Sequence, residues 1–292
     1  MNEFELIDGI LRELGPVADG GVIGPGDDCS ALTPPSGELL VSSIDTLISG
    51  VHFPDDGPGD QVGYRAMMVS VSDLAAMGAE PVQMLVAMTL EETDQRWALA
   101  VARGMREALE ETGGKLLGGN LGRGPRSITV SVHGFCPESE LLLRSGAQAN
   151  DQIFVTGPLG ASAAAVALER LGVPDDPLTA RYYRPQARTH IGLKLRGAAT
   201  AAIDVSDGLL QDLGHLCAAS GLGAELVSGQ IPVADGAGLD HALHGGDDYE
   251  LLFTAPTLPD GVEAEAIGVM VSEAGIRLDG EAVTIKGYQH FL

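Results

Sequence analysis

The sequence predicts an α+β protein built from two mixed α/β domains. Its 292 residues are enough for two domains with separate cores. Strand-like and helix-like segments mix along the whole chain without regular alternation, and no GxGxxG motif is present. We place the boundary near Pro137 and expect one domain over residues 1–137 and another over 138–292.

The first domain should contain helices and strands in mixed order. Apolar residues at helical spacing predict helices over 4–14, 60–77 and 94–111. Alternating or continuous apolar runs predict strands over 22–23, 39–44, 82–90, 115–117 and 127–136. We expect the strand over 39–44 to end at Asp45, and the strand over 115–117 to end before the glycine-rich segment 118–125.

The second domain should be equally mixed. Helical spacing predicts helices over 160–171, 189–201 and 206–220, the last with Ser206 as its N-cap. Strands are predicted over 151–156, 224–227, 250–254 and 264–269. The apolar pair 202–203 lies between two predicted helices, and a proline-broken connection is expected over 173–177.

The charge balance excludes partners that require a basic surface. A formal charge of −24 and a pI near 4.4 predict that the chain binds neither nucleic acid nor an anionic membrane. No apolar stretch approaches the roughly 20 residues that span a bilayer, and the acidic amino terminus does not resemble a signal peptide. Three widely spaced cysteines, Cys29, Cys136 and Cys217, are expected to be free buried thiols. We therefore expect a cytoplasmic location.

Acidic or amide side chains recur beside glycine, serine or apolar residues. These stretches are Gly26-Asp27-Asp28, Ser43-Ile44-Asp45, Ser72-Asp73-Leu74, Gly118-Gly119-Asn120, Asp204-Val205-Ser206-Asp207-Gly208 and Gly245-Gly246-Asp247-Asp248. Two carboxylates about 4 Å apart repel by about 4 kcal/mol at an effective dielectric of about 20. If these stretches meet in space, they require bound cations, which would most naturally hold a polyphosphate.

Asp73 and Asp204 support this hypothesis on physical grounds. Asp73 ends a helix that is otherwise nearly uncharged there, and no basic residue stands within a helical turn of it. A buried isolated carboxylate usually pairs or binds metal, so the alternatives are a distant arginine or a backbone cap. Asp204 ends an apolar run before the predicted helix, so the dipole of that helix does not account for it. Asp207, at the start of the helix, could serve only that dipole.

Other segments are suited to anionic ligands. Segment 118–125 combines backbone amides, expected to be exposed, with Arg123, and Arg144 precedes a flexible Ser145-Gly146 turn. His52 could donate to an anionic group, although a lone histidine is more often structural. No P-loop and no Cys-His or G-x-S-x-G nucleophile motif is present.

Four ordered motifs resemble those of the thiamine-monophosphate kinase family, in the superfamily of aminoimidazole ribonucleotide synthetase and selenophosphate synthetase. They are Gly26-Asp27-Asp28-Cys29, Val71-Ser72-Asp73-Leu74-Ala75-Ala76-Met77-Gly78-Ala79, Ile203-Asp204-Val205-Ser206-Asp207-Gly208-Leu209 and Gly245-Gly246-Asp247-Asp248-Tyr249-Glu250-Leu251. The tail Lys286-Gly287-Tyr288-Gln289-His290-Phe291 is also similar, so the resemblance covers residues 4–291.

The resemblance implies phosphorylation of thiamine monophosphate by ATP, by direct transfer and without a dedicated catalytic residue. Several magnesium ions would be held by Asp28, Ser43, Ile44 (through its backbone), Asp45, Asp73, Asn120, Asp204 and Asp207. ATP would contact Gly119, Asn120, Arg144 and Ser206, and the thiamine phosphate would contact His52, Asp247 and Tyr288. The family also implies a homodimer joined through its amino-terminal sheets.

Two positions depart from the family pattern. Asn120 stands where the family has aspartate, and Asp247 where it has glutamate. An amide binds magnesium more weakly than a carboxylate. The side chain of Asp247 is one methylene shorter than that of glutamate, and the geometry of the reacting groups is sensitive to shifts of about 1 Å. Two alternatives therefore stay open: a related enzyme with another acceptor, and a nucleotide-binding paralogue without turnover.

Overall fold

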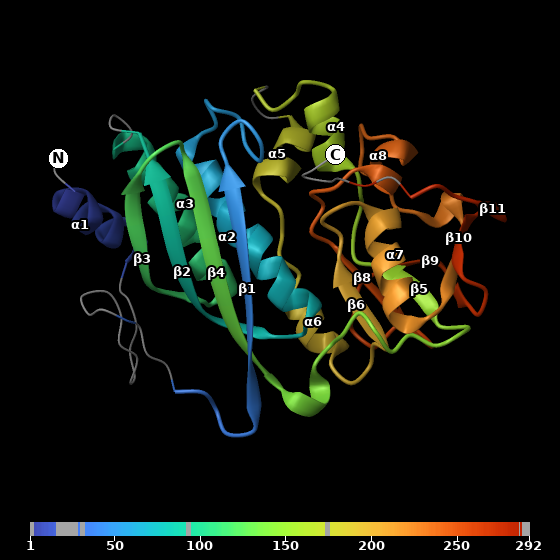
Figure 1. Cartoon of the computed structure of the whole chain (residues 1–292). Coiled ribbons are helices and arrows are strands. Elements are labelled where there is room, and N and C mark those ends of the chain that lie inside the picture. The colour runs from blue at the N-terminus through green and yellow to red at the C-terminus, as the bar shows by residue number, and fades with distance from the viewer. Residues whose placement is uncertain are drawn as a thin grey trace. The chain divides into compact units, whose positions relative to one another are not determined.

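The computed structural model describes residues 3–15, 29, 33–91, 95–172, 176–285 and 287 (Figure 1). The chain divides into two compact units. Unit 1 comprises Met1–Leu74 and Glu80–Glu138, and unit 2 comprises Ala75–Ala79 and Ser139–Leu292. Each unit has a sheet and helices of its own, which confirms the predicted pair of α+β domains.

Unit 1 is a four-stranded sheet with helices. Its elements are α1 (Glu3–Leu14), β1 (Glu38–Ile48), α2 (Gly59–Ala76), β2 (Glu80–Leu90), α3 (Gln95–Thr112), β3 (Lys115–Arg123) and β4 (Ser127–Pro137). The strand order is β1-β4-β2-β3, antiparallel except between β2 and β3. The parallel pair is joined through α3, as a crossover connection requires. Helices α2 and α3 lie on the same face of the sheet (Figure 1).

The two faces of β1 differ in burial. Side chains alternate along a strand, so Ser43, Asp45 and Leu47 share one face. Their partners on β4 are Val132, Val130 and Ile128, which are all buried. On the opposite face, Leu40, Ile44 and Ile48 are exposed. Asp45 is therefore on the buried side of this strand.

Two strands of unit 1 continue through segments expected to be turns. Strand β1 does not end at Asp45 but runs to Ile48, because its register with β4 continues to the pair Ile48–Ser127. Strand β3 runs through Gly119 and Asn120, which pair with Val86 and Ala87 of β2. Cross-strand pairing overrides the local turn preference of glycine, serine and aspartate.

Unit 2 is built on a seven-stranded mixed sheet of order β11-β10-β7-β9-β5-β8-β6. Its strands are β5 (Gln152–Val155), β6 (Ala201–Asp204), β7 (Gly223–Leu226), β8 (Leu251–Ala255), β9 (Glu265–Val271), β10 (Gly275–Leu278) and β11 (Glu281–Ala282). Its helices are α4 (Ala161–Ala167), α5 (Pro177–Tyr183), α6 (Thr189–Leu195), α7 (Leu209–Ser220) and α8 (Leu239–His244), with short 3-10 turns at Glu138–Glu140 and Ser228–Gln230.

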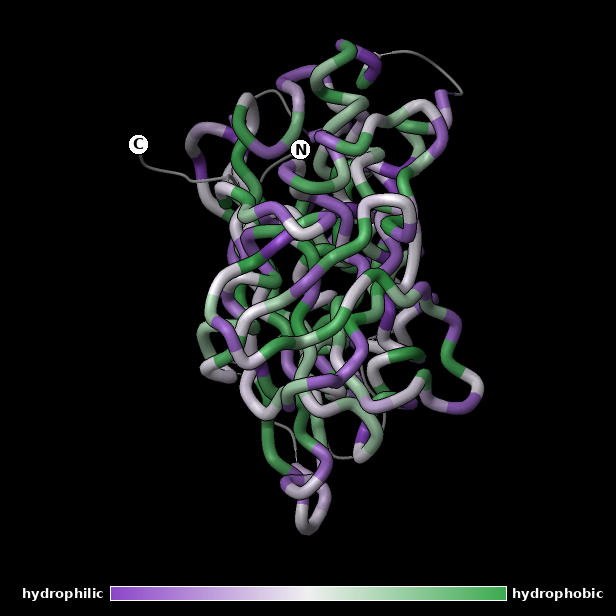
Figure 2. Tube along the Cα trace, turned by 90° about the vertical axis from the view of Figure 1, so that its right-hand side faces the viewer, coloured by the Kyte–Doolittle hydropathy of each residue, from purple (hydrophilic) through white to green (hydrophobic). Residues whose placement is uncertain are grey.

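Two apolar clusters form the core of unit 2. The larger joins the sheet to α7 and α8 through residues such as Leu213, Leu216 and Ile267. The other includes α6 and the stacked rings of Phe154 and Phe253, whose centroids are 5.1 Å apart. Hydrophobic and hydrophilic residues follow one another at short intervals along much of the trace (Figure 2), as expected for elements with one buried face.

The helices of unit 2 differ from expectation mainly at their ends. Helix α7 begins at Leu209 with Gly208 as its N-cap, so the prediction of Ser206 as N-cap was wrong. Helices α4 and α6 stop at Ala167 and Leu195, before the predicted ends. The sequence did not predict α5, α8, β10 or β11, because segments this short carry little periodic signal.

The predictions for the three cysteines had different outcomes. Cys136 and Cys217 are buried free thiols, but Cys29 is exposed, so the expectation for that thiol was wrong. Among the described residues, no helix combines the length and apolarity needed to cross a bilayer. The strand expected over 22–23 lies outside the described residues.

Candidate functional site

Unit 1 brings together two of the predicted carboxylates. Asp45, on the buried face of β1, interacts electrostatically with Asp73 in the last turn of α2. The hydroxyl of Ser43 donates a hydrogen bond to Oδ2 of Asp73. Burial and then the charge of Asp73 raise the pKa of Asp45 to about 6, whereas a hydrogen bond from Ser70 opposes the rise. The pair is under electrostatic strain that a cation would relieve.

The donor set of this cluster fits magnesium. Carboxylate and hydroxyl oxygens are hard ligands of the kind that magnesium prefers, and neither sulfur nor imidazole is needed. Ile44 lies between the two inner residues with its side chain on the exposed face of β1. It can therefore offer only its backbone to a ligand on the buried face.

His52 lies in the turn that follows β1. The backbone N–H of Ile48 donates to its Nδ1 over 3.1 Å, so in the neutral ring the proton is on Nε2. Phe53 anchors the turn by stacking on Trp97, with ring centroids 6.1 Å apart. The turn thus holds a histidine whose Nε2 is the donor in the neutral form.

Gly119 and Asn120 lie on β3, not on a loop. A Cβ at Gly119 would be 2.0 Å from the carbonyl oxygen of Val86, so the close approach of β2 by itself requires glycine there. Both residues are exposed. Asn120 can present its amide from an edge strand, whereas the prediction that the strand ends before this segment was wrong.

Two predicted site residues cannot be placed. Asp28 and Tyr288 lie outside the described residues. Arg144 is exposed in the connection before β5 and its carbonyl oxygen accepts a hydrogen bond from Ser220 over 3.3 Å.

Unit 2 joins two of the motifs into one pair of loops. Asp204 ends β6 and is buried. After it, the loop over 205–208 is hydrogen-bonded to the loop over 245–249. The N–H of Asp247 donates to the carbonyl of Ser206 over 2.9 Å, and that of Tyr249 to the carbonyl of Val205 over 2.8 Å. The residue expected to bind the acceptor is thus attached to the residues expected to bind nucleotide and metal.

The second loop has an unusual backbone. A Cβ at Gly246 would be 2.2 Å from the carbonyl oxygen of Ser206, so glycine is needed for the loops to meet. Asp247 and Tyr249 have φ of 70° and 55°, which non-glycine residues seldom adopt. The Tyr249 hydroxyl donates to Oδ1 of Asp247 over 2.8 Å. Such strain persists where surrounding contacts over-determine it, often at functional sites.

Sequence reasoning missed Asp212, in the first turn of α7. Burial raises the pKa of this carboxyl to about 7, although it accepts hydrogen bonds from three backbone N–H groups, those of Ser206, Asp207 and Gly208. Asp207, Asp212 and His215 each offer a ligand atom, and these atoms lie within 4.8 Å of one another. An acid among the leucines of the helix predicted over 206–220 was the available signal.

Two further acids connect the loop over 245–249 to other segments: Asp248 within it and Glu250 directly after it. Both carboxylate oxygens of Asp248 accept from the N–H of Gly160 at 2.9 Å, and burial raises the pKa of this carboxyl to about 8. Glu250, almost fully buried, pairs with Arg181 at 2.8 Å and with Arg188 at 2.6 Å. Breaking a buried pair of this kind leaves an uncompensated charge.

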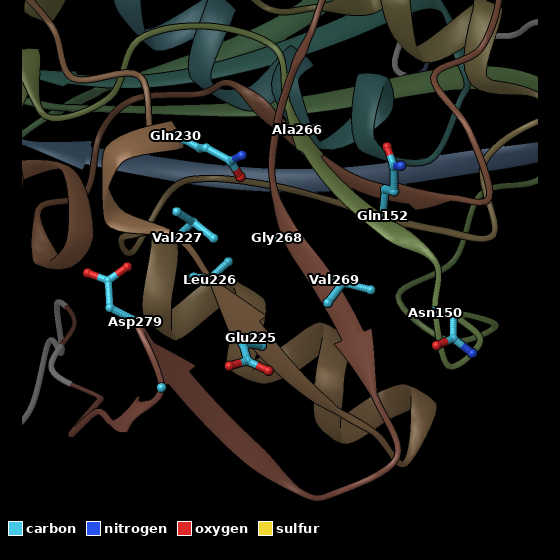
Figure 3. Close-up of a pocket in the computed structure, with 11 residues that line it drawn as sticks. Asn150, Gln152, Glu225, Leu226, Val227, Gln230, Ala266, Gly268, Val269 and Asp279 are labelled. Atoms are coloured by element: carbon cyan, nitrogen blue, oxygen red, sulfur yellow. The ribbon is translucent and has the colours of Figure 1, made fainter.

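A cavity of about 660 Å³ in unit 2 is separate from these loops (Figure 3). It lies over β5, β7 and β9, and its polar lining comes from side chains including Gln152, Glu225, Gln230 and Asp279. None of the predicted site residues lines it. Its carboxylates and amides do not form a site for an anionic nucleotide.

The chain matches two family models. Residues 26–136 match the AIR synthase related protein, N-terminal domain, and residues 148–279 match the AIR synthase related protein, C-terminal domain. Thiamine-monophosphate kinase of Salmonella typhimurium is 42% identical over 298 residues, covering 92% of this chain and 91% of the relative.

Solved structures of similar proteins have the same fold as this chain. Thiamine-monophosphate kinase from Stenotrophomonas maltophilia K279a has a TM-score of 0.86 at 36% identity, with 97% of this chain and 98% of that chain covered. AaThiL complexed with AMPPCP and TMP has a TM-score of 0.83 at 30% identity, with 99% and 97% covered. Given this identity across nearly the full length of both sequences, the chain belongs to the thiamine-monophosphate kinase family.

Proposed function

We propose that this protein transfers the terminal phosphoryl group of ATP to thiamine monophosphate and releases thiamine diphosphate and ADP. The observation that carries the proposal is the acidic cluster of unit 1, in which Ser43, Asp45 and Asp73 form a partly buried oxygen site that favours a cation. The relatives named thiamine-monophosphate kinase support the reaction, and the AaThiL complex with AMPPCP and TMP supports the pair of substrates.

Magnesium ions would be held by hard oxygen donors. We assign this role to Asp28, Ser43, the backbone of Ile44, Asp45, Asp73, Asn120, Asp204 and Asp207. Bound magnesium would neutralise phosphate charge, which is most of what a phosphoryl transfer requires besides positioning. Asn120 contributes one negative charge less than an aspartate would.

The remaining assigned residues position the two phosphorylated molecules. Gly119, Asn120, Arg144 and Ser206 would contact ATP, with Arg144 offering a planar cation to phosphate oxygens. His52, Asp247 and Tyr288 would contact thiamine monophosphate. The Nε2–H of neutral His52 suits a phosphate oxygen. No dedicated base is needed, because the acceptor phosphate is largely ionised near neutral pH.

Residues 1–137 would then form a metal-binding, ATP-binding and dimerisation domain, with 138–292 as its partner domain. The dimer is supported by apolar side chains on the uncovered face of β1 and the turn after it. Leu40, Ile44 and Val51 are 57%, 64% and 59% exposed. Exposed apolar patches of this kind mark interaction surfaces, and the sheet of a second copy is the occupant that we propose.

Incubation with ATP, magnesium and thiamine monophosphate, followed by chromatography, tests the activity. We expect thiamine diphosphate and ADP in equal amounts, and no product when magnesium is removed with a chelator. Binding of ATP without thiamine diphosphate formation would sink the kinase proposal and favour a paralogue without turnover. ADP release only with a different phosphorylated or carboxylated acceptor would favour a related enzyme.

A further inference from the structure

The buried acid Asp212 has no role among the residues assigned above. Its side chain lies in the first turn of α7, and the residue is only 2% exposed. A single oxygen, Oδ2, accepts from the N–H groups of Ser206, Asp207 and Gly208 at 3.0, 3.0 and 3.1 Å. Charged acceptors make such bonds stronger than neutral ones do.

This arrangement differs from an ordinary helix cap. An N-cap side chain accepts N–H groups of the first helical turn, whereas Asp212 accepts those of Gly208, the N-cap of α7, and of the two residues before it. Asp212 reaches back from inside the helix and gathers the amides of the preceding loop. Successive amides that point at one spot also form a binding site for anions, and here the carboxylate fills that site.

The loop that Asp212 holds carries assigned site residues. Ser206 and Asp207 belong to it, and Gln211, in the same turn of α7 as Asp212, donates to Oδ2 of Asp207 over 3.0 Å. The same loop accepts the N–H groups of Asp247 and Tyr249. Removal of the Asp212 carboxylate would therefore release the backbone that supports both loops.

We propose that Asp212 is a positioning residue that shapes the loop over 205–208, so that Ser206 and Asp207 meet ATP and its metal. The inference rests on the proposed function. The competing role is that of a metal ligand beside Asp207 and His215. Positioning is favoured because Oδ2 already accepts three hydrogen bonds and because magnesium prefers oxygen donors to imidazole.

Two substitutions separate these roles. Asp212→Ala removes the acceptor, whereas Asp212→Asn keeps an oxygen of the same reach. Asp176→Ala is the matched control, because Asp176 accepts the N–H groups of Leu178 and Thr179 at the start of α5, which carries no assigned site residue. All variants are compared by thermal unfolding, by calorimetric binding of AMPPCP with magnesium, and by kcat and KM for ATP.

Asp212→Ala should weaken AMPPCP binding and raise the KM for ATP by about tenfold or more, in the range seen for residues that support ligands. Asp212→Asn should recover most of that loss at the same magnesium concentration. Asp176→Ala should lower the melting temperature without changing nucleotide binding.

Two results would overturn the proposal. One is an Asp212→Ala variant that is less stable but binds AMPPCP like the unaltered protein. The other is an Asp212→Asn variant that needs as much extra magnesium as Asp207→Asn, which would make Asp212 a ligand. If the unaltered protein binds AMPPCP but forms no thiamine diphosphate, the proposed function fails, while the binding measurements still decide the role of Asp212.

Discussion

At the scale of single residues, the pair Asp45 and Asp73 shows how burial and charge act together. Each carboxylate is partly buried, and the second raises the pKa of the first. Asp73 could be singled out from the sequence because a charge interrupts an apolar helix end. Asp45 could not be assigned to the buried face before the register of β1 was known.

Asp73→Asn should reduce thiamine diphosphate formation by about 100-fold, while the protein keeps its fold. The amide keeps the shape of the side chain but removes a charge that would hold magnesium, and losing a ligand is costlier than losing a supporting residue. Turnover and thermal unfolding are measured together, with exposed Asp56→Asn as the control. Full turnover in Asp73→Asn would show that this residue is no metal ligand.

Asp248 should make the stability of the protein depend on pH. Its folded pKa of about 8 lies above the ordinary value of 3.8, so the folded state holds a proton that the unfolded state releases between these values. This contribution is complete below about pH 4 and is lost as the pH rises to about 8. Asp248→Asn does not titrate.

Thermal unfolding at pH 5, 7 and 9 checks this prediction. The melting temperature of Asp248→Asn, relative to the unaltered protein, should rise by a few degrees between pH 5 and pH 9. A relative melting temperature that stays constant or falls would mean that Asp248 is ionised in the folded protein throughout this range.

At the scale of elements, strand pairing decided which motifs form loops. Glycine-rich and acidic segments favour turns locally, yet Gly119 and Asn120 lie in β3 and Asp45 in β1, because neighbouring strands satisfy their backbone groups. The loops at 205–208 and 245–249 do form. They depend on each other through hydrogen bonds between backbone groups.

Gly246→Ala tests that dependence. The added Cβ would lie 2.2 Å from the carbonyl oxygen of Ser206, so the loops must separate and Asp247 must move. A shift of about 1 Å can cost about 100-fold in rate, so we expect a raised KM for thiamine monophosphate and a lower kcat. Gly229→Ala, where a Cβ meets no atom within 4 Å, is the control and should behave like the unaltered protein. Unchanged kinetics in Gly246→Ala would show that the loop contact does not position Asp247.

At the scale of the whole molecule, the proposed dimer can be tested by the mass of the protein in solution. Leu40→Glu places a charge on the exposed face of β1 and should convert a dimer into a monomer, as light scattering after gel filtration would show. Leu258→Glu, at a 40% exposed leucine of unit 2, should leave the mass unchanged. A monomeric unaltered protein, or a dimer that tolerates Leu40→Glu, would contradict the proposed interface.

The sequence by itself determined the pair of α+β domains, the acidic motifs and their family likeness. Local periodicity, charge and residue order carry this information directly. Asp73 and Asp204 were identifiable for the same reason, since an acid in an apolar run is visible without coordinates.

Only the tertiary structure decided which of these residues act together. It assigned Asp45 to the buried face of β1, joined the Asp247 loop to the Ser206 loop, and placed Asp212 beneath the loop that it supports. Strand register and contacts between distant segments set these relations. They leave no trace in a local pattern, because each depends on the free energy of the whole packed unit.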